Sequence, residues 1–321
     1  MRLVVTGGSG FLGGFVLREA AARGYEVAAL ARSPAAAAAV RALGARPVGG
    51  DLAAPGPAAA AALAEAFAAG DVLVNLASLG FGDAPAIVAA AERAQVRGAV
   101  FVSTTAVTTT LPAASKRVRL AAEQRIAESA LDWIILRPTM IYGAPGDRNL
   151  SRLLPLLCRV PVLPVPGGGH LQQPVHVADV AHAVLAAAEL IGAELAGSGP
   201  AGSGLADCGL AGSGLAGGKP AGVTYDLAGP VPLTFGELLR TAGQAVGSRT
   251  RFVPVPLPPV LAAARGYELV SRSPRIRAEQ VRRLAEDKAF GIRAAARDLG
   301  FAPRSFAAGI RSEARALGLA A

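Results

Sequence analysis

A glycine-rich turn near the start of the chain constrains the fold most strongly. The segment Arg2–Thr6 has the apolar pattern of a buried strand, and Phe11–Arg23 has the apolar spacing of a helix. Between them Gly7, Gly10 and Gly13 follow the spacing G-x-x-G-x-x-G. In such a joint the first glycine permits a tight turn, and the third lets the helix pack close to the strand. The pattern therefore predicts a β-α unit that opens a parallel sheet.

The same turn predicts a dinucleotide-binding site. Its second glycine lets the backbone approach a pyrophosphate, and the N-terminus of the following helix offers N–H groups and a positive dipole end to the phosphates. The alternative is an ordinary strand–turn–helix joint without a ligand, which the position and context of the glycines disfavour. The residues that we expect at the cofactor are Thr6, Gly7, Gly8, Ser9, Gly10, Phe11, Leu12 and Gly13.

The end of the second expected strand, Glu26–Ala31, indicates which dinucleotide is bound. A carboxylate there would hold the ribose hydroxyls of NAD. Here Arg32 and Ser33 follow the strand, and a guanidinium can pair with a 2′-phosphate. We therefore expect NADP in preference to NAD, the alternative being that Arg32 is a surface arginine. Later strand ends should add the cofactor contacts Asp51, Leu52, Leu76, Ala77, Ser78 and Pro138.

Strand and helix patterns alternate through residues 1–142. Further strands are expected at Arg46–Val48, Val72–Ala77, Ala99–Ser103 and Trp133–Arg137. Helices are expected at Pro34–Leu43, Pro57–Ala69, Ala84–Ala94 and Lys116–Ser129. Repeated β-α units of this length predict an α/β fold, a Rossmann-type doubly wound parallel sheet with helices on both faces. We assign residues 1–142 to an NAD(P)-binding Rossmann domain.

The second half of the chain has a different organisation. Proline is frequent between residues 138 and 166, which indicates an irregular segment. Helices are expected at Ala178–Leu190, Thr234–Val246 and Glu279–Leu299, and a strand at Val223–Leu227. We expect the Rossmann domain to return at about 174–191 and 223–229. A smaller, discontinuous substrate-binding portion is expected from residues 143–173 and 230–321.

Residues 192–222 form a low-complexity segment of glycine, alanine and serine. The letters Ala-Gly-Ser-Gly occur at 196, 201 and 211. Such tracts cannot bury enough apolar surface to become ordered. We expect a disordered insertion, because a strand pattern resumes at Val223.

Composition excludes several classes of protein. Hydrophobic residues make up 52% of the 321 residues, which excludes a disordered chain. Two cysteines are too few for a disulfide scaffold or a cysteine zinc site. The chain shows no signal-peptide pattern and no uncharged apolar run of ~18 residues, so we expect a cytoplasmic protein without a membrane span.

The net charge of +9 admits two interpretations. One is a solvated basic surface, and the other is attraction to anionic ligands such as phosphates. The sequence has no basic stripe interleaved with aromatic residues, so we expect no nucleic-acid partner.

Several motifs along the chain match one known family in their order. They are Thr6–Gly13, Asp51, Asn75–Ser78, Val102–Thr105, Ile135–Pro138, Ile141–Gly143, Pro174–Val180, Tyr225–Pro230 and Leu299–Pro303. In these motifs the chain resembles the extended and atypical branches of the short-chain dehydrogenase/reductase superfamily, the NAD-dependent epimerase/dehydratase type. The resemblance implies a Rossmann fold and hydride transfer coupled to proton transfer at a carbonyl or an alcohol.

The resemblance also implies a catalytic set that this sequence keeps only in part. In the family a tyrosine acts as general acid/base, a lysine four residues later lowers its pKa, and a serine or threonine after the fifth strand holds the substrate oxygen. Thr105 stands at the serine/threonine position, but the Tyr-x-x-x-Lys pair is missing. One alignment keeps Lys116 and puts Pro112 in place of the tyrosine. The other puts Arg119 at the lysine and Ser115 at the tyrosine.

We prefer the second alignment because it preserves the family spacing to Glu123 and to Arg137. Lys116 would still lie on nearly the same helix face as Arg119. Tyr142 could replace the missing tyrosine, although a packing role is the favoured interpretation of its ring. The candidate catalytic residues are Thr105, Ser115, Lys116, Arg119 and Tyr142.

A second set of residues falls where the family places substrate contacts. These candidates are Ser78, Arg148, Asn149, Gln173 and His176. Gln173 stands near a position where nucleotide-sugar members carry a basic residue, which disfavours a nucleotide-sugar substrate. The alternative is that these are polar loop residues at the domain boundary.

The spacing His176-x-x-Asp179-x-x-His182 raises the question of a metal site. Residues three apart on a helix share a face. Asp179 is better explained as the cap of the following helix, so we expect no metal.

Two functions from different classes follow. The first is an NAD(P)-dependent oxidoreductase, epimerase or dehydratase that acts on a carbonyl or alcohol, with a nucleotide-linked, phosphate-bearing sugar as one candidate substrate. A variant of it uses other acid/base groups on a quinone, an isoprenoid or a small carbonyl. The second is a non-catalytic NADP(H)-binding sensor or assembly subunit that lost the tyrosine. The resemblance alone makes a homodimer plausible.

Overall fold

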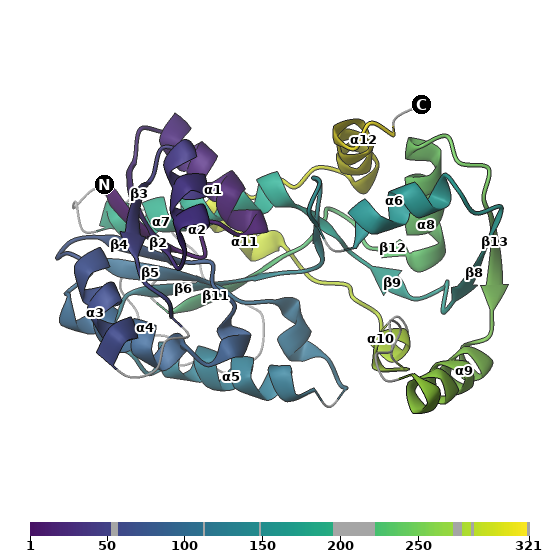
Figure 1. The fold of residues 1–321 in the computed structure, drawn as a ribbon, viewed down its shortest axis with the longest axis horizontal. Helices are drawn as coiled ribbons and strands as arrows, with labels where there is room; N and C mark the ends of the chain where they lie inside the picture. The colour runs from purple at the N-terminus through teal and green to yellow at the C-terminus, as the bar shows by residue number, and fades with distance from the viewer. Residues whose placement is uncertain are drawn as a thin grey trace.

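A seven-stranded parallel sheet organises the larger of two lobes (Figure 1). Its strand order is β11-β6-β5-β4-β1-β2-β3. The chain adds β2 and β3 on one side of β1 and then crosses to add β4 and the later strands on the other side. This is the doubly wound Rossmann arrangement, so the predicted fold class is confirmed. The strands are β1 (Arg2–Thr6), β2 (Glu26–Ala31), β3 (Arg46–Gly49), β4 (Val72–Asn75), β5 (Gly98–Val102), β6 (Trp133–Pro138) and β11 (Val223–Leu227).

The computed structural model describes most of the chain. The described residues are 1–52, 57–111, 113–147, 149–194, 222–271, 278–283 and 286–319. The predicted insertion at 192–222 falls largely outside them. Its first residues belong to helix α7 (Val177–Glu194), which extends four residues beyond the expected end at Leu190.

Each face of the sheet packs against its own layer of helices. Leu3 and Val5 of β1 enter one apolar cluster and Val4 enters the other, as the alternation of side chains along a strand requires. The first cluster joins the sheet to α1 (Phe11–Ala22) and α7. The second joins it to α3 (Pro57–Ala66), α4 (Ala84–Arg93) and α5 (Ala114–Ala127). Helix α2 (Pro34–Ala42) packs beside β2 and β3. The strands are buried on both sides, which explains their continuous apolar sequences.

The smaller lobe has a separate apolar core. Tyr142, Leu154, Leu238 and Ile310 are among its buried side chains. Its elements are α6 (Leu150–Leu157), β8 (Val162–Pro166), β9 (Leu171–Gln172), β12 (Leu233–Thr234), α8 (Phe235–Ala245), β13 (Arg251–Val255), α9 (Leu257–Val270), α10 (Ala278–Arg283) and α12 (Phe306–Ala316). The short parallel pair β7 (Ile141–Tyr142) and β10 (Val175–His176) lies where the chain passes between the lobes.

The stretch Glu279–Leu299, expected as helical, is not one helix. Helix α10 ends at Arg283, and α11 (Arg293–Leu299) begins after a non-helical segment that includes residues 286–292. Ala295 and Leu299 of α11 are buried in the core cluster of the large lobe. The break occurs because these residues bury their apolar side chains on the sheet, while α10 packs against α9 in the small lobe.

A buried ion pair fastens α5 to β6. Arg137 donates to Glu123 through Nε at 3.1 Å and through Nη2 at 2.5 Å, and Ser103 adds a hydrogen bond to Glu123 Oε1. The side chain of Glu123 is 7% exposed and that of Arg137 is 25% exposed. The hydrogen bonds that Arg137 donates to Glu123 raise the pKa of the guanidinium. This pair joins two elements that flank the carboxyl end of β5.

Replacing Glu123 by glutamine should destabilise the fold. It removes the charge opposite Arg137 and leaves the guanidinium partly buried, which costs roughly 3 kcal/mol. Urea denaturation would measure the difference. Glu128→Gln is the matched control, because Glu128 is exposed at the C-cap of the same helix and accepts a hydrogen bond from Gln124. Equal stabilities of the two variants would contradict the importance of the pair.

Candidate functional site

The glycine turn lies against the end of β4. Gly7 has a φ of +70°, and a Cβ atom on it would lie 2.7 Å from the amide nitrogen of Ala77. A Cβ atom on Gly13 would lie 2.4 Å from the carbonyl oxygen of Gly8. Neither distance is compatible with a side chain, so the first and third glycines perform the roles expected from their spacing.

The N-terminus of α1 is open to a ligand. The N-cap residue, Gly10, provides no side-chain cap, and the first turn contains no acidic residue. The N–H groups of this turn have no intrahelical acceptors and carry the positive end of the helix dipole. Ser9 and Gly10 are exposed. These features fit the pyrophosphate of a dinucleotide.

The ends of β1 and β4 are tied together beneath the turn. Thr6 donates to Asn75 Oδ1 at 2.5 Å, and Asn75 Nδ2 donates to the carbonyl of Ala77 at 3.1 Å. Thr6 and Asn75 are fully buried. The side chain of Thr6 therefore supports the turn from within the protein.

The remaining predicted cofactor residues lie along the same edge. Arg32 is exposed at the end of β2, and the adjacent Ser33 caps α2 by accepting from Ala36 N at 3.2 Å. Asp51 is exposed, and Leu52 packs against the core of the large lobe. Leu76, Ala77 and Ser78 are half-buried, and Pro138 is buried.

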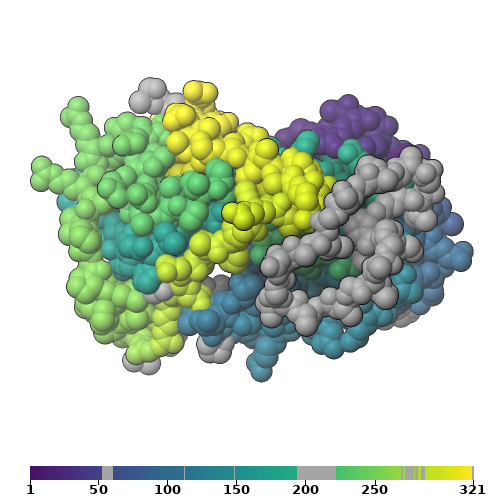
Figure 2. All heavy atoms as spheres, turned by 180° about the vertical axis from the view of Figure 1, so that it is seen from behind, coloured from purple at the N-terminus to yellow at the C-terminus, as the bar shows by residue number. Residues whose placement is uncertain are grey.

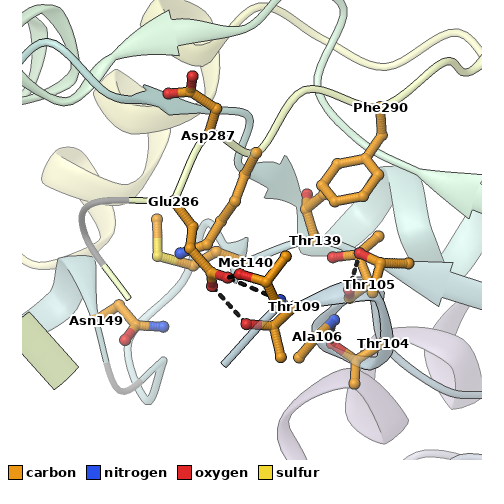
Figure 3. A pocket seen from close by; sticks show the side chains of 13 residues that line it. Thr104, Thr105, Ala106, Thr109, Thr139, Met140, Asn149, Glu286, Asp287 and Phe290 are labelled. Atoms are coloured by element: carbon orange, nitrogen blue, oxygen red, sulfur yellow. Dashed lines mark hydrogen bonds between the residues drawn. The ribbon is translucent and has the colours of Figure 1, made fainter. Parts of the chain in front are cut away.

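A cavity of about 620 Å³ opens between the two lobes beyond this edge (Figure 3). One wall is the loop that follows β5, and another is the segment that leads from α10 to α11. Its lining is rich in threonine hydroxyls and includes Thr104, Thr105, Ala106, Thr108, Thr109, Thr110, Thr139, Met140, Asn149, Glu286, Asp287, Lys288 and Phe290. Of the predicted catalytic and substrate residues, Thr105 and Asn149 line this cavity.

Thr105 is held at the cavity wall by its neighbours. It is 7% exposed, and its hydroxyl donates to the carbonyl of Pro138 at 3.4 Å. Thr104 caps the short helix Thr105–Thr108 by accepting from Ala106 N at 3.2 Å. The hydroxyl therefore stands between β5 and β6 at the carboxyl edge of the sheet, where open α/β sheets bind ligands.

Residues 286–290 form a strap that crosses between the lobes, and Figure 2 shows the C-terminal part of the chain passing from the small lobe to the large one. Glu286 accepts from the Thr109 hydroxyl at 2.5 Å and from both N and Oγ1 of Thr110 at 2.9 and 2.8 Å. Further along, the amide of Gln173 accepts from Phe290 N at 2.7 Å and donates to the Gly229 carbonyl at 2.7 Å. The strap is thus fastened to both sides of the cavity.

Ser115, Lys116 and Arg119 lie on α5, behind the cavity wall. The amine of Lys116 donates to the carbonyl of Thr109, whose side chain lines the cavity. Arg119 lies over Gly80 and donates to the carbonyl of Ser115 at 3.4 Å. None of the three belongs to the lining that the structure describes.

Tyr142, Gln173 and His176 turn away from the cavity. Tyr142 is fully buried, and its hydroxyl faces the Phe306 carbonyl at 3.5 Å; burial raises the pKa of that hydroxyl. His176 packs edge-on against Tyr142, and burial, followed by the charge of Arg304, lowers the pKa of His176 to about 4. Phe306 of α12 packs on the ring of Tyr142, and the backbone of Gly143 lies against the ring of His176. Both predicted residues are therefore buried outside the described lining of the cavity.

Gln173 and Ser78 form hydrogen bonds with neighbouring backbone groups. Gln173 is 4% exposed and its amide is occupied by Gly229 and Phe290, so it positions the strap. Ser78 accepts from Gly80 N at 3.2 Å at the start of a short helix beside Arg119. Arg148 lies outside the described residues.

The strap is the part of the site that the sequence did not reveal. Glu286–Phe290 was expected inside a helix, although Gly291, directly after it, was a local signal against a continuous helix. The threonines at 104, 105 and 108–110 did offer a signal, since they cluster directly after the fifth expected strand.

A buried carboxyl pair fastens the loop that carries Asn149. Asp147 accepts from Asn149 N at 2.7 Å, and Glu313 of α12 accepts from Gly143 N at 3.0 Å and from Ser151 Oγ at 3.1 Å. The pKa of Glu313 is raised to about 8, mainly because the carboxyl is buried and then because Asp147 lies beside it. Glu313 therefore keeps its proton at neutral pH in the folded protein.

The chain belongs to the NAD(P)H-binding family, whose model matches residues 7–189. This match covers more than half of the chain and includes the glycine turn, the loop after β5 and most of α7. Binding of an NAD(P) cofactor is therefore established at the level of the family.

Two curated relatives resemble the chain over part of its length. One is the 4-hydroxy-2-methyl-3-oxo-4-farnesyl-3,4-dihydroquinoline-1-oxide ketoreductase of Stigmatella aurantiaca, 32% identical over an alignment of 219 positions that covers 58% of this chain and 64% of the relative. The other is the ceramide reductase of Caulobacter vibrioides, 32% identical over an alignment of 198 positions that covers 57% of this chain and 60% of the relative. The chain thus matches less than two thirds of the length of either relative.

Solved structures resemble the chain over nearly its whole length. Triphenylmethane reductase from Citrobacter sp. has a TM-score of 0.70 with 18% identity, covering 99% of this chain and 100% of that one. UDP-glucuronic acid 4-epimerase from Bacillus cereus, solved with NAD, has a TM-score of 0.66 with 14% identity, covering 99% of both chains. The extended short-chain dehydrogenase/reductase fold is confirmed. Among the described residues, the helices are too short or too polar to cross a bilayer.

Gly13→Ala should weaken NADPH binding and destabilise the fold by roughly 1–3 kcal/mol, because the new Cβ meets backbone atoms of the turn. Gly14→Ala is the matched control on the same helix. Its Cβ would meet nothing closer than 3.8 Å, so it should stabilise α1 by roughly 0.5–1 kcal/mol. Calorimetric titration and thermal melting would measure both effects. Similar behaviour of the two variants would argue against the proposed backbone contact.

The contribution of Glu313 to stability should depend on pH. The folded state holds the Glu313 proton up to about pH 8, whereas the unfolded chain releases it near 4.5. The stabilising contribution is complete below about pH 4.5 and is lost as the pH rises through 8. The difference in unfolding free energy between the wild type and Glu313→Gln should therefore shrink or reverse over this window. If the unfolding free energies of the wild type and of Glu313→Gln changed in parallel with pH, the raised pKa of Glu313 would be refuted.

Proposed function

We propose that the protein is an NADP(H)-dependent reductase of an uncharged carbonyl compound. The observation that carries this proposal is the threonine-lined cavity at the carboxyl edge of the sheet, with Thr105 between β5 and β6. The reaction transfers a hydride from NADPH, which becomes NADP⁺, to the carbonyl carbon, and the oxygen takes up a proton that solvent supplies. In this proposal the Thr105 hydroxyl exchanges its long 3.4 Å bond to the Pro138 carbonyl for a bond to the substrate oxygen, and it fixes the position of that oxygen.

The charges at the cavity support a neutral substrate. Glu286 is held by Thr109 and Thr110, and Asp287 accepts from Leu171 N at 2.8 Å. The Lys288 amine lies 3.4 Å from Gln172 Oε1. Each charged lining residue that the structure describes is thus engaged with the protein. This favours a ketone over a diphosphate-linked sugar, which would need unengaged cations.

The names of the relatives support the same substrate class. One is named as a ketoreductase of a farnesyl-bearing compound, and the other as a reductase of ceramide. A lipophilic ketone fits the mixture of hydroxyls with Met140 and Phe290 in the lining.

The position of Lys116 suggests how charge on the substrate oxygen is balanced. Its amine donates to the Thr109 carbonyl at the back of the cavity wall. A positive charge there stabilises negative charge that develops on the substrate oxygen. In this role Lys116 is a positioning residue.

Removing the Thr105 hydroxyl should impair turnover. Thr105→Val should lower kcat/KM for NADPH-dependent ketone reduction by about a hundredfold, the typical effect of losing one hydrogen-bond donor to a developing oxyanion. Thr105→Ser, which keeps the hydroxyl, should retain most of the activity. The decrease in NADPH absorbance with a panel of lipophilic ketones measures both. Equal rates for the valine and serine variants would remove Thr105 from the proposal.

Arg32 should select NADPH over NADH. It is exposed beside the end of β2, and Ser33 anchors the start of α2 next to it. Arg32→Ala should weaken NADPH binding by about tenfold and leave NADH binding nearly unchanged. Arg41→Ala, an exposed arginine on α2, is the control. Comparable affinities of the wild type for both nucleotides would contradict this preference.

A second candidate is a non-catalytic NADP(H)-binding subunit. The observation that favours it is that no tyrosine lies in the described cavity lining, while Tyr142 faces the interior. This function predicts tight nucleotide binding without turnover of any ketone.

A further inference from the structure

The end of the small lobe opposite the large sheet exposes an apolar helix face. Strand β13 passes through Pro256 into α9, so both elements lie at this end (Figure 1). One face of α9 packs against α10 through Leu257, Val260, Leu261 and Ala264. The exposed residues of α9 are Pro258, Pro259, Ala262, Ala263, Arg265, Gly266, Tyr267 and Val270.

The composition of this exposed face is unusual for a surface helix. Val270 is 87% exposed, and Tyr267 is 42% exposed. Arg265 is the single charged residue among the exposed side chains that the structure describes on α9. By contrast, α12 exposes Arg311, Ser312 and Arg315, as an ordinary amphipathic helix does. A helix that is apolar on both faces normally has a partner on each of them.

The neighbouring strands expose apolar side chains too. Val162 of β8 is 50% exposed, and Val253 of β13 is 46% exposed. Val253 alternates along β13 with Phe252 and Pro254, which line a cavity of about 570 Å³ on the other face of the strand pair. The exposed apolar surface is therefore made by α9 and the two valines, and the cavity is not part of it.

Arginines outnumber acids around this surface among the side chains that the structure describes on α8, β13, α9 and α10. Arg240, Arg251, Arg265 and Arg282 are exposed on these four elements. Two carboxylates lie on them as well: Glu237 caps α8 with Thr234, and Glu268 of α9 accepts from Ala278 N at 3.0 Å. Exposed apolar residues bordered by arginines match the interface of a bilayer that contains anionic lipids.

We propose that this end of the small lobe docks on an anionic lipid bilayer. The docking surface consists of the exposed face of α9, Val162 and Val253, with the four arginines at its border. The helix lies in the plane of the interface, its apolar residues enter the boundary of the acyl chains, and the arginines pair with lipid phosphates. The arginine border would repel the same surface of a second copy, which favours lipid as the occupant. The proposal does not depend on the reductase activity.

Flotation with vesicles tests the proposal. The full chain should float with vesicles of phosphatidylglycerol and phosphatidylcholine, and not with phosphatidylcholine alone. High salt should weaken the binding, because the arginine contribution is screened. Val270→Glu and Arg265→Glu should each reduce partitioning by about tenfold. The melting temperature of each variant shows whether it is folded. The salt titration tests the arginine contribution on the wild type alone.

Two matched variants serve as controls. Phe81→Glu changes a 79% exposed apolar residue on the large lobe, and Arg41→Glu reverses an exposed arginine on α2. Both should bind vesicles as the wild type does. Absence of flotation with the anionic vesicles, or equal flotation of Val270→Glu, would overturn the proposal. Self-association of the wild type that Val270→Glu abolishes would also overturn it, since a second copy would then cover the face.

Discussion

The close backbone contact between the glycine turn and the end of β4 is the constraint on which the rest of the structure depends. Gly7 leaves no room for a Cβ against Ala77, and Gly13 leaves none against Gly8. The bond from Thr6 to Asn75 ties the two strands directly beneath. Together these contacts direct the N-terminus of α1 to the edge of the sheet between β1 and β4, where the chain changes side. The expected cofactor site and the cleft therefore lie at the same edge of the sheet.

The second lobe completes the site through a few tertiary bonds. Glu286 joins the strap to the threonine loop after β5, and the amide of Gln173 joins it to Phe290 and Gly229. These partners are more than 50 residues apart in every case, the nearest pair being separated by 56. The cavity therefore exists only when both lobes are in place. Its chemistry is dominated by hydroxyl groups because the charged side chains nearby are used to hold the strap.

The Rossmann half could be predicted almost element by element, and the candidate site only in part. Strands such as β1 and β2 have the predicted bounds because their apolar pattern and the flanking glycines are local signals. Thr105 and Asn149, which the family resemblance singled out, line the cavity. Tyr142 and His176 occupy comparable positions in the chain, yet α12 covers them. Proximity to a strand end does not reveal which way a side chain turns once another element packs on it.

The sequence by itself determined the doubly wound fold and the glycine turn at which we expect the dinucleotide, because the apolar pattern of the strands and the spacing of the glycines are both local properties. The tertiary structure alone decided which side chains face the substrate cavity. It separated α10 from α11, turned residues 286–290 into a strap, and directed Tyr142 into the core. The physical reason is that the direction of a side chain is set by the elements that pack against it, and those elements come from distant parts of the chain.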